Sequence, residues 1–174
     1  MFKTLLVGCA AGTALLLGTA SVAEANGLAF GRSQAPAPLE GTWQVEITPF
    51  VCSTGQAVPN STFRSMLTFA KGGTMVETTF SPRFQPGQRS IGMGYWERTG
   101  KDAYHVVFEA FIHFTSVVTP PATPAYQRSL QRVDQGLEML DNDHFESSAT
   151  VSFRDEAGTP LSSGCMTAKG VRLQ

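Results

Sequence analysis

The sequence of 174 residues contains few of the residues from which metal and nucleophilic sites are built. It has three histidines and three cysteines, and their spacing matches no Cys/His metal motif. No Gly-x-Ser-x-Gly turn places a serine beside a base, and no glycine-rich loop is arranged to cradle a phosphate. These absences argue against a metal site, a bound cofactor and hydrolase chemistry of the triad type.

The sequence also lacks an excess of charge and any charge run. Lys plus Arg number 13 and Asp plus Glu 14, so nucleic acid and an anionic membrane surface are not favoured as partners. The apolar stretch at residues 5–17 is interrupted by glycine and threonine and is too short for a membrane span. We therefore expect no stable membrane insertion.

That apolar stretch belongs to a leader pattern. Lys3 precedes it and Ala23-Glu24-Ala25 follows it, which together predict a secretory signal peptide over residues 1–25. An uncleaved anchor is the alternative. Residues 26–38 are rich in Gly, Ala and Pro and predict a flexible N-terminal arm. We therefore expect an exported protein, periplasmic or extracellular, and the sequence leaves its oligomeric state open.

From Thr42 onward the apolar residues alternate with polar ones, with no sustained helical period. Trp43, Val45 and Ile47 fall on one face of the first segment, which is typical of a strand with one buried side. The sequence therefore predicts an all-β domain. Its eight expected strands lie near residues 42–48, 63–69, 74–80, 92–98, 103–114, 126–140, 145–154 and 161–173.

The connections between these strands alternate in length. Tight turns are expected at residues 70–73, 99–102 and 141–144, because Gly, Asn and Asp gather there. The longer connections are residues 50–62, 81–91 and 115–125, with a modest one near residues 155–160. An up-and-down antiparallel order places tight turns at one end of the sheet and long loops at the other.

Export leaves Cys52 and Cys165 as the two cysteines of the mature chain, and an oxidising compartment favours a disulfide over free thiols. If they face each other in paired first and last strands, facing residues sum to 217, which places Trp43 opposite Gln174 and close to Arg172. This register predicts closure of the sheet into a barrel without open edges.

Gly41-Thr42-Trp43 at the start of the first strand, with Arg172 near the end of the last, resembles the lipocalin signature. The resemblance covers residues 39–174 and places the chain among lipocalin-like, calycin-type bacterial barrels. It implies an eight-stranded cup that holds a small apolar molecule. It also implies that Trp43 plugs the closed end and that Arg172 packs over it, a cation–π contact worth about 1 kcal/mol.

Two groups of side chains are candidates for ligand binding. Arg83, Phe84 and Arg89 lie in the long loop at the expected mouth, where arginine could bind an anionic or carboxylate-bearing ligand. Ordinary solvated loop charge is the alternative for these residues. Aromatic side chains either line the lumen or fill it: Phe63, Phe69, Trp96, Tyr104, Phe108 and Phe153.

His105, Glu109 and His113 lie four residues apart in one expected strand, on the face opposite the apolar one. Residues four apart in a strand are separated by about 13 Å, too far to share one metal ion. We therefore interpret them as a solvated face. Glu77 and Glu97 are the carboxylates to inspect for catalysis, because the pattern does not fix the inward parity of their strands.

These patterns favour a secreted or periplasmic lipocalin-like protein that binds a small hydrophobic molecule in its lumen. The alternatives are a cofactor-free isomerase or cyclase that uses the same lumen, and a structural or inhibitory module with a filled barrel. An enclosed space below about 100 Å³ favours the filled barrel. An inward titratable group with an unsatisfied partner favours the enzyme.

Overall fold

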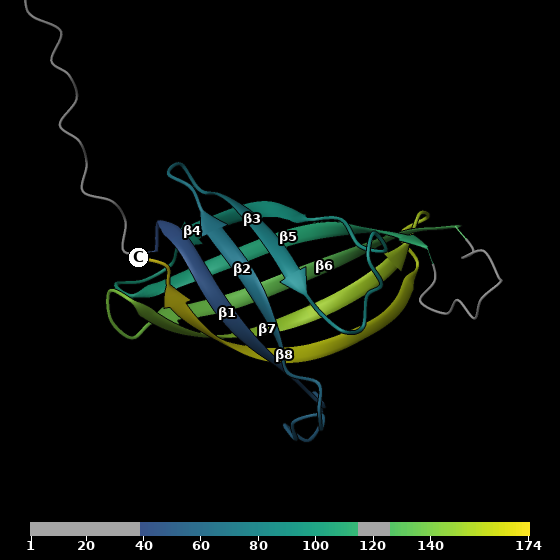
Figure 1. Cartoon of the computed structure of the whole chain (residues 1–174), viewed down its shortest axis with the longest axis horizontal. Coiled ribbons are helices and arrows are strands. Elements are labelled where there is room, and N and C mark those ends of the chain that lie inside the picture. The colour runs from purple at the N-terminus through teal and green to yellow at the C-terminus, as the bar shows by residue number, and fades with distance from the viewer. Residues whose placement is uncertain (1–38, 115–125) are drawn as a thin grey trace, which may run out of the picture. The chain divides into compact units, whose positions relative to one another are not determined.

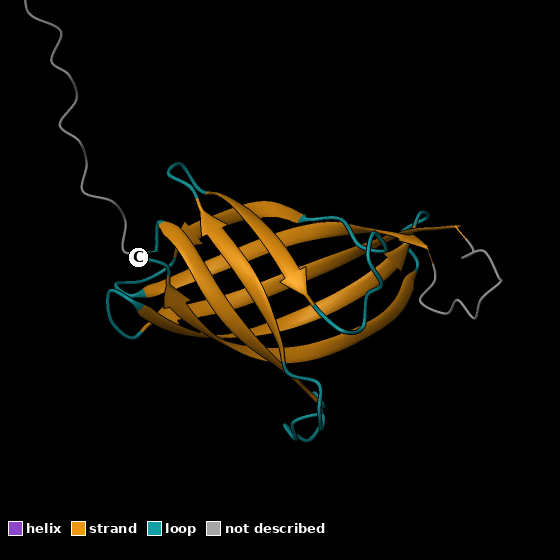
Figure 2. Cartoon of the chain, in the orientation of Figure 1, coloured by secondary structure: helices purple, strands orange, loops and turns teal. Residues whose placement is uncertain are grey.

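The computed structural model describes residues 39–114 and 126–174, which form a closed barrel of eight antiparallel strands in the order β1 to β8 (Figure 1). All regular structure in these two ranges is β (Figure 2), so the predicted fold class is confirmed. The strands are β1 (Gly41–Phe50), β2 (Phe63–Phe69), β3 (Thr74–Phe80), β4 (Gly92–Arg98), β5 (Ala103–Phe114), β6 (Tyr126–Met139), β7 (His144–Asp155) and β8 (Pro160–Arg172).

The alternating pattern places one face of each strand in the barrel interior. In β1, Trp43, Val45 and Ile47 are buried, whereas Gln44 and Glu46 are exposed. The turns that join β2 to β3 and β6 to β7 lie at the same end of the barrel as the C-terminus (Figure 1). The connections from β3 to β4 and from β7 to β8 lie at the other end (Figure 1). We call these two ends the closed end and the mouth.

The barrel closes by pairing of β1 with β8, and the predicted disulfide joins Cys52 to Cys165 with their Cα atoms 5.3 Å apart. The predicted register was wrong by two residues, because Trp43 pairs with Arg172 and Cys165 pairs with Phe50. Cys52 lies beyond the end of β1, in a turn, so the bridge forms diagonally and not between directly opposed residues. The inward and outward faces are unaffected, since a shift of two residues preserves parity.

Trp43 is fully buried at the closed end. Its ring meets Phe145 edge-on at 5.0 Å between centroids, and the guanidinium of Arg172 lies 4.2 Å from the ring centroid. The indole nitrogen donates a hydrogen bond of 3.0 Å to the Leu39 carbonyl. A β-carbon on Gly170 would fall 2.1 Å from an atom of the Phe145 ring, so only glycine leaves that ring room to reach Trp43.

The strands β3 and β4 pair along only part of their length. These strands pair only from Thr74–Tyr95 to Glu77–Gly92, and the rest of β3 continues without β4 beside it. Residues 81–91 follow, and their last part pairs with the mouth end of β5 through an Arg89–Ile112 bridge. The result is a split in the wall between the end of β3 and this segment. We call it the β3–β4 split.

The expected signal peptide over residues 1–25 and the expected arm over residues 26–38 lie outside the described residues. Within residues 39–114 and 126–174, no helix is long and apolar enough to cross a membrane.

Candidate functional site

The half of the barrel interior toward the mouth carries polar side chains, whereas the closed end is apolar. Inward positions on β2, β3 and β6 hold buried Ser65, Glu77, Ser129, Gln131 and Gln135. Buried polar groups weaken a barrel unless they are hydrogen-bonded, so such a cluster calls for a specific arrangement of partners. It is the first feature that points to a site rather than to packing alone.

An ion pair between Glu77 and Arg89 forms the centre of this cluster. Arg89 Nη2 lies 2.8 Å from Glu77 Oε2, and the two side chains are only 5% and 3% exposed. Ser65 donates a hydrogen bond of 2.9 Å to the other carboxylate oxygen of Glu77. The Nε of Arg89 donates to Gln131 Oε1, and its Nη1 donates to the Ser90 carbonyl at 3.1 Å. The pair is thus fixed from three sides.

Backbone pairing of residues 81–91 with β5 carries Arg89 into the interior. The Ser90 amide donates to the Phe111 carbonyl at 2.9 Å, and the His113 amide donates to the Gln88 carbonyl at 2.8 Å. Gln88 is buried, and its side-chain nitrogen donates to the Phe114 carbonyl at 3.1 Å. The arginine therefore enters the barrel from a loop that is held against β5.

The lumen below this ion pair is almost full. The cavity there has a volume of about 20 Å³, and its lining includes Leu67, Glu77, Phe108 and Gln135. A space of this size holds about one water molecule. Because this volume is below about 100 Å³, this part of the barrel is filled.

A pocket of about 480 Å³ lies in the β3–β4 split, which is within the usual range for small-molecule sites. Five of its twelve lining residues are apolar: Phe80, Pro82, Phe84, Pro86 and Ile91. Arg89 and Thr79 also line it, and the Arg89 guanidinium lies 5.8 Å from the centroid of the Phe84 ring. We call this cavity the split pocket.

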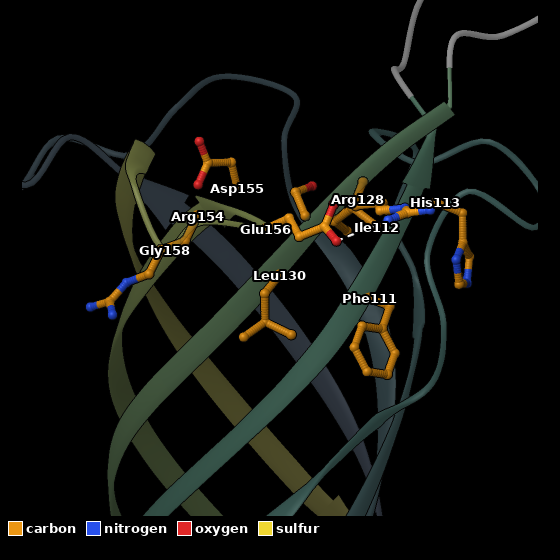
Figure 3. Close-up of a pocket in the computed structure, with 10 residues that line it drawn as sticks. Phe111, Ile112, His113, Arg128, Leu130, Arg154, Asp155, Glu156 and Gly158 are labelled. Carbon is orange, nitrogen blue, oxygen red and sulfur yellow. Dashed lines mark hydrogen bonds and ion pairs between the residues drawn. The ribbon is translucent and has the colours of Figure 1, made fainter.

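A second pocket, of about 620 Å³, lies near the mouth ends of β5 and β6 and the turn after β7 (Figure 3). Exposed Phe111 and partly buried Leu130 stand side by side there on neighbouring strands (Figure 3). Its charged residues are largely solvated, and Arg128 pairs with Glu156 at 2.9 Å with both side chains more than half exposed. Unlike the split pocket, it contains no buried ion pair among its described lining residues.

The predicted aromatic residues do not gather in one pocket. Near the closed end, Phe69 and Trp96 form a T-shaped contact with ring centroids 6.1 Å apart, and Trp96 and Tyr104 form a tilted contact at 5.8 Å. Phe108 lines the small lumen cavity, and Phe63 and Phe153 are partly buried against the core. Arg83 is exposed in its loop, whereas the side chain of Arg89 is only 5% exposed. Of the predicted residues, the structure brings Arg89 together with Phe84 and Glu77.

Glu97 and His105 face outward on β4 and β5, away from the lumen. His105 Nε2 lies 2.9 Å from Asp134 and its Nδ1 lies 3.4 Å from Glu97. The hydrogen bond with Asp134 is the main cause that raises the pKa of His105 above its usual 6.5, burial opposes it, and Glu97 adds to it. Among the residues that the structure describes, no group of three or more His, Cys, Asp or Glu could hold a metal ion.

A raised pKa of His105 predicts a pH-dependent contribution to stability. The charged ring stabilises the folded protein fully below the unfolded pKa of about 6.5, and this gain is lost as pH rises through the higher folded pKa. We expect Asp134→Asn to lower the pKa of His105 in an NMR titration and to flatten the dependence of unfolding free energy on pH above 6.5. An unchanged His105 titration in the variant would contradict this assignment.

Sequence reasoning missed Ser65, Gln131 and Gln135 as site residues. The signal was present in β6, because Gln131 and Gln135 share parity with the apolar Val133 and Leu137. A polar residue on an apolar face is the pattern that would have found them.

No protein-family model matches the chain, and no curated protein matches it either.

Proposed function

We propose that this is an exported, lipocalin-like protein that binds a small hydrophobic molecule at the mouth half of its barrel, in the split pocket. The leader pattern and the disulfide support export, since disulfides persist in oxidising compartments. The observation that carries the binding role is a ligand-sized pocket of about 480 Å³ that is lined by five apolar residues and by one arginine with a buried side chain. The small lumen cavity below it supports a site at the split rather than deep in the barrel.

The geometry favours binding over acid–base catalysis. A catalytic carboxylate needs an oxygen free to exchange a proton with a substrate. In Glu77, Oε1 accepts a hydrogen bond from Ser65, whereas Oε2 forms an ion pair with Arg89 Nη2 at 2.8 Å and accepts no hydrogen bond from the described residues. Glu97 is exposed to solvent on the outer surface. The ion pair of Glu77 with Arg89 and the solvated position of Glu97 therefore support binding over the alternative isomerase or cyclase chemistry.

A neutral, environment-sensitive fluorophore, N-phenylnaphthylamine, tests the proposed function. We expect saturable binding with one site per chain, and about tenfold weaker binding in Phe84→Ala, because burying a phenyl ring contributes about 1.5–3 kcal/mol. Leu161→Ala is the matched control, since Leu161 is 50% exposed on β8 and does not line the split pocket. Absence of saturable binding, or equal loss in both variants, would reject this site.

A further inference from the structure

Arg89 is an unusual residue to find inside a barrel. It belongs to a connecting segment, yet its side chain is 5% exposed and reaches the interior through the β3–β4 split. Its Nε and Nη1 donate hydrogen bonds to Gln131 and Ser90, and its Nη2 forms the ion pair with Glu77, so at most three of the five N–H groups of the guanidinium are engaged. Arginine binds carboxylates best with two parallel N–H donors, whereas Glu77 engages only one of its nitrogens. The fork is therefore only partly used by its partner.

Glu77 is held in this position by specific features of the wall. Ser65 donates to its Oε1 at 2.9 Å, and Gly92 faces its Oε2. A β-carbon at Gly92 would lie 2.8 Å from that oxygen, so the missing side chain leaves the space that the carboxylate occupies. A buried ion pair of this kind rarely adds stability compared with apolar packing. Its presence beside a pocket therefore calls for a role other than stability.

The split pocket adjoins this ion pair, because Arg89 is one of its lining residues. Arg89 lines the pocket together with Phe80, Phe84 and Ile91. Thr79 lines it as well, and its buried hydroxyl oxygen has no hydrogen-bond partner among the described residues. A ligand seated in the pocket thus meets apolar side chains and one cation, whereas the Thr79 hydroxyl oxygen itself is buried. An apolar molecule that ends in a carboxylate matches the apolar side chains and the cation.

We propose that the ligand carries a carboxylate that binds Arg89, and that Glu77 occupies the place of this carboxylate while the pocket is empty. This inference rests on the proposed binding function. Glu77 then acts as an internal competitor that keeps Arg89 paired and buried without ligand. Arg89 becomes the residue that sets specificity for acids over neutral molecules of the same shape.

Two probes with the same chain test this inference: dansyl-labelled undecanoic acid and the corresponding undecanol. The measured quantity is the Kd of the alcohol divided by the Kd of the acid, which we call the acid preference. We expect an acid preference above one in the wild-type protein. Glu77→Gln removes the competing charge, so the acid preference should rise about tenfold, mainly through tighter binding of the acid.

Arg89→Gln should lower the acid preference to about one while the alcohol still binds. Arg89→Lys keeps the charge but not the fork, so it should retain part of the preference. Arg89→Gln alone leaves the buried carboxylate of Glu77 without its partner and can prevent folding. The double variant Glu77→Gln with Arg89→Gln replaces the ion pair by two neutral side chains and covers that case. It should also show an acid preference of about one.

The outcomes separate this inference from the proposed function. If both probes bind and the acid preference is the same in wild type and in the neutral double variant, the ion pair is structural and the inference is wrong, while the binding role stands. If neither probe binds the wild-type protein, the proposed function fails as well. A rise in acid preference in Glu77→Gln together with its loss in the double variant is the supporting result.

Discussion

Replacing Trp43 by alanine is expected to lower the free energy of unfolding by about 4 kcal/mol, within the usual range for a buried Trp or Phe changed to Ala. The change removes a fully buried ring, its edge contact with Phe145 and its cation–π contact with Arg172. It also leaves the Leu39 carbonyl without the indole donor. Urea unfolding followed by circular dichroism measures the loss.

Phe80→Ala is the matched control for Trp43→Ala, because Phe80 is an aromatic residue of the same barrel that is 87% exposed. Surface substitutions usually change stability by less than about 0.5 kcal/mol. Equal stability losses in the two variants would show that Trp43 is not a core residue. The contrast between them therefore tests the packing of the closed end directly.

Removal of the disulfide is the second large effect. Cys52 and Cys165 are 113 residues apart in sequence, and a cross-link over so long a loop is worth about 4 kcal/mol in the chain-entropy model. Cys165→Ser should therefore lower the melting temperature of the oxidised protein clearly. The double variant Cys52→Ser with Cys165→Ser should unfold like the single variant.

Reduction of the wild-type protein provides the control for the disulfide prediction. The reduced protein should melt close to the serine variants, because all of them lack the same cross-link. A melting temperature that is unchanged between intact oxidised wild type and Cys165→Ser would contradict a stabilising bridge. A drop in the variant that reduction of the wild type fails to reproduce would point to packing of the sulfur atoms instead.

The fold could be predicted from the sequence because alternation and turn residues are local signals. The expected ranges for β2, β3, β4 and β5 coincide with the observed strands, since glycine, proline and polar turns mark their ends. The register of β1 with β8 could not be predicted correctly from two cysteines. A disulfide tolerates a diagonal arrangement, and Cys52 lies past the strand end.

The site was less predictable, because it depends on how a loop returns to the barrel. The sequence indicated Arg89 as a mouth residue and Glu77 as a carboxylate to inspect, but it did not bring them together. Their contact arises because β3 and β4 pair over only four residues and residues 81–91 join β5. Such pairing between distant backbone segments has no signature in local periodicity.

The position of the disulfide also affects what a single cut in the backbone would do. Cys52 precedes the segment of residues 81–91 and Cys165 follows it, so a protease that cleaves after the exposed Arg83 divides the chain between the two cysteines. The two fragments then remain one covalent molecule until a reductant is added. A cut in this segment would therefore leave both parts of the barrel covalently linked.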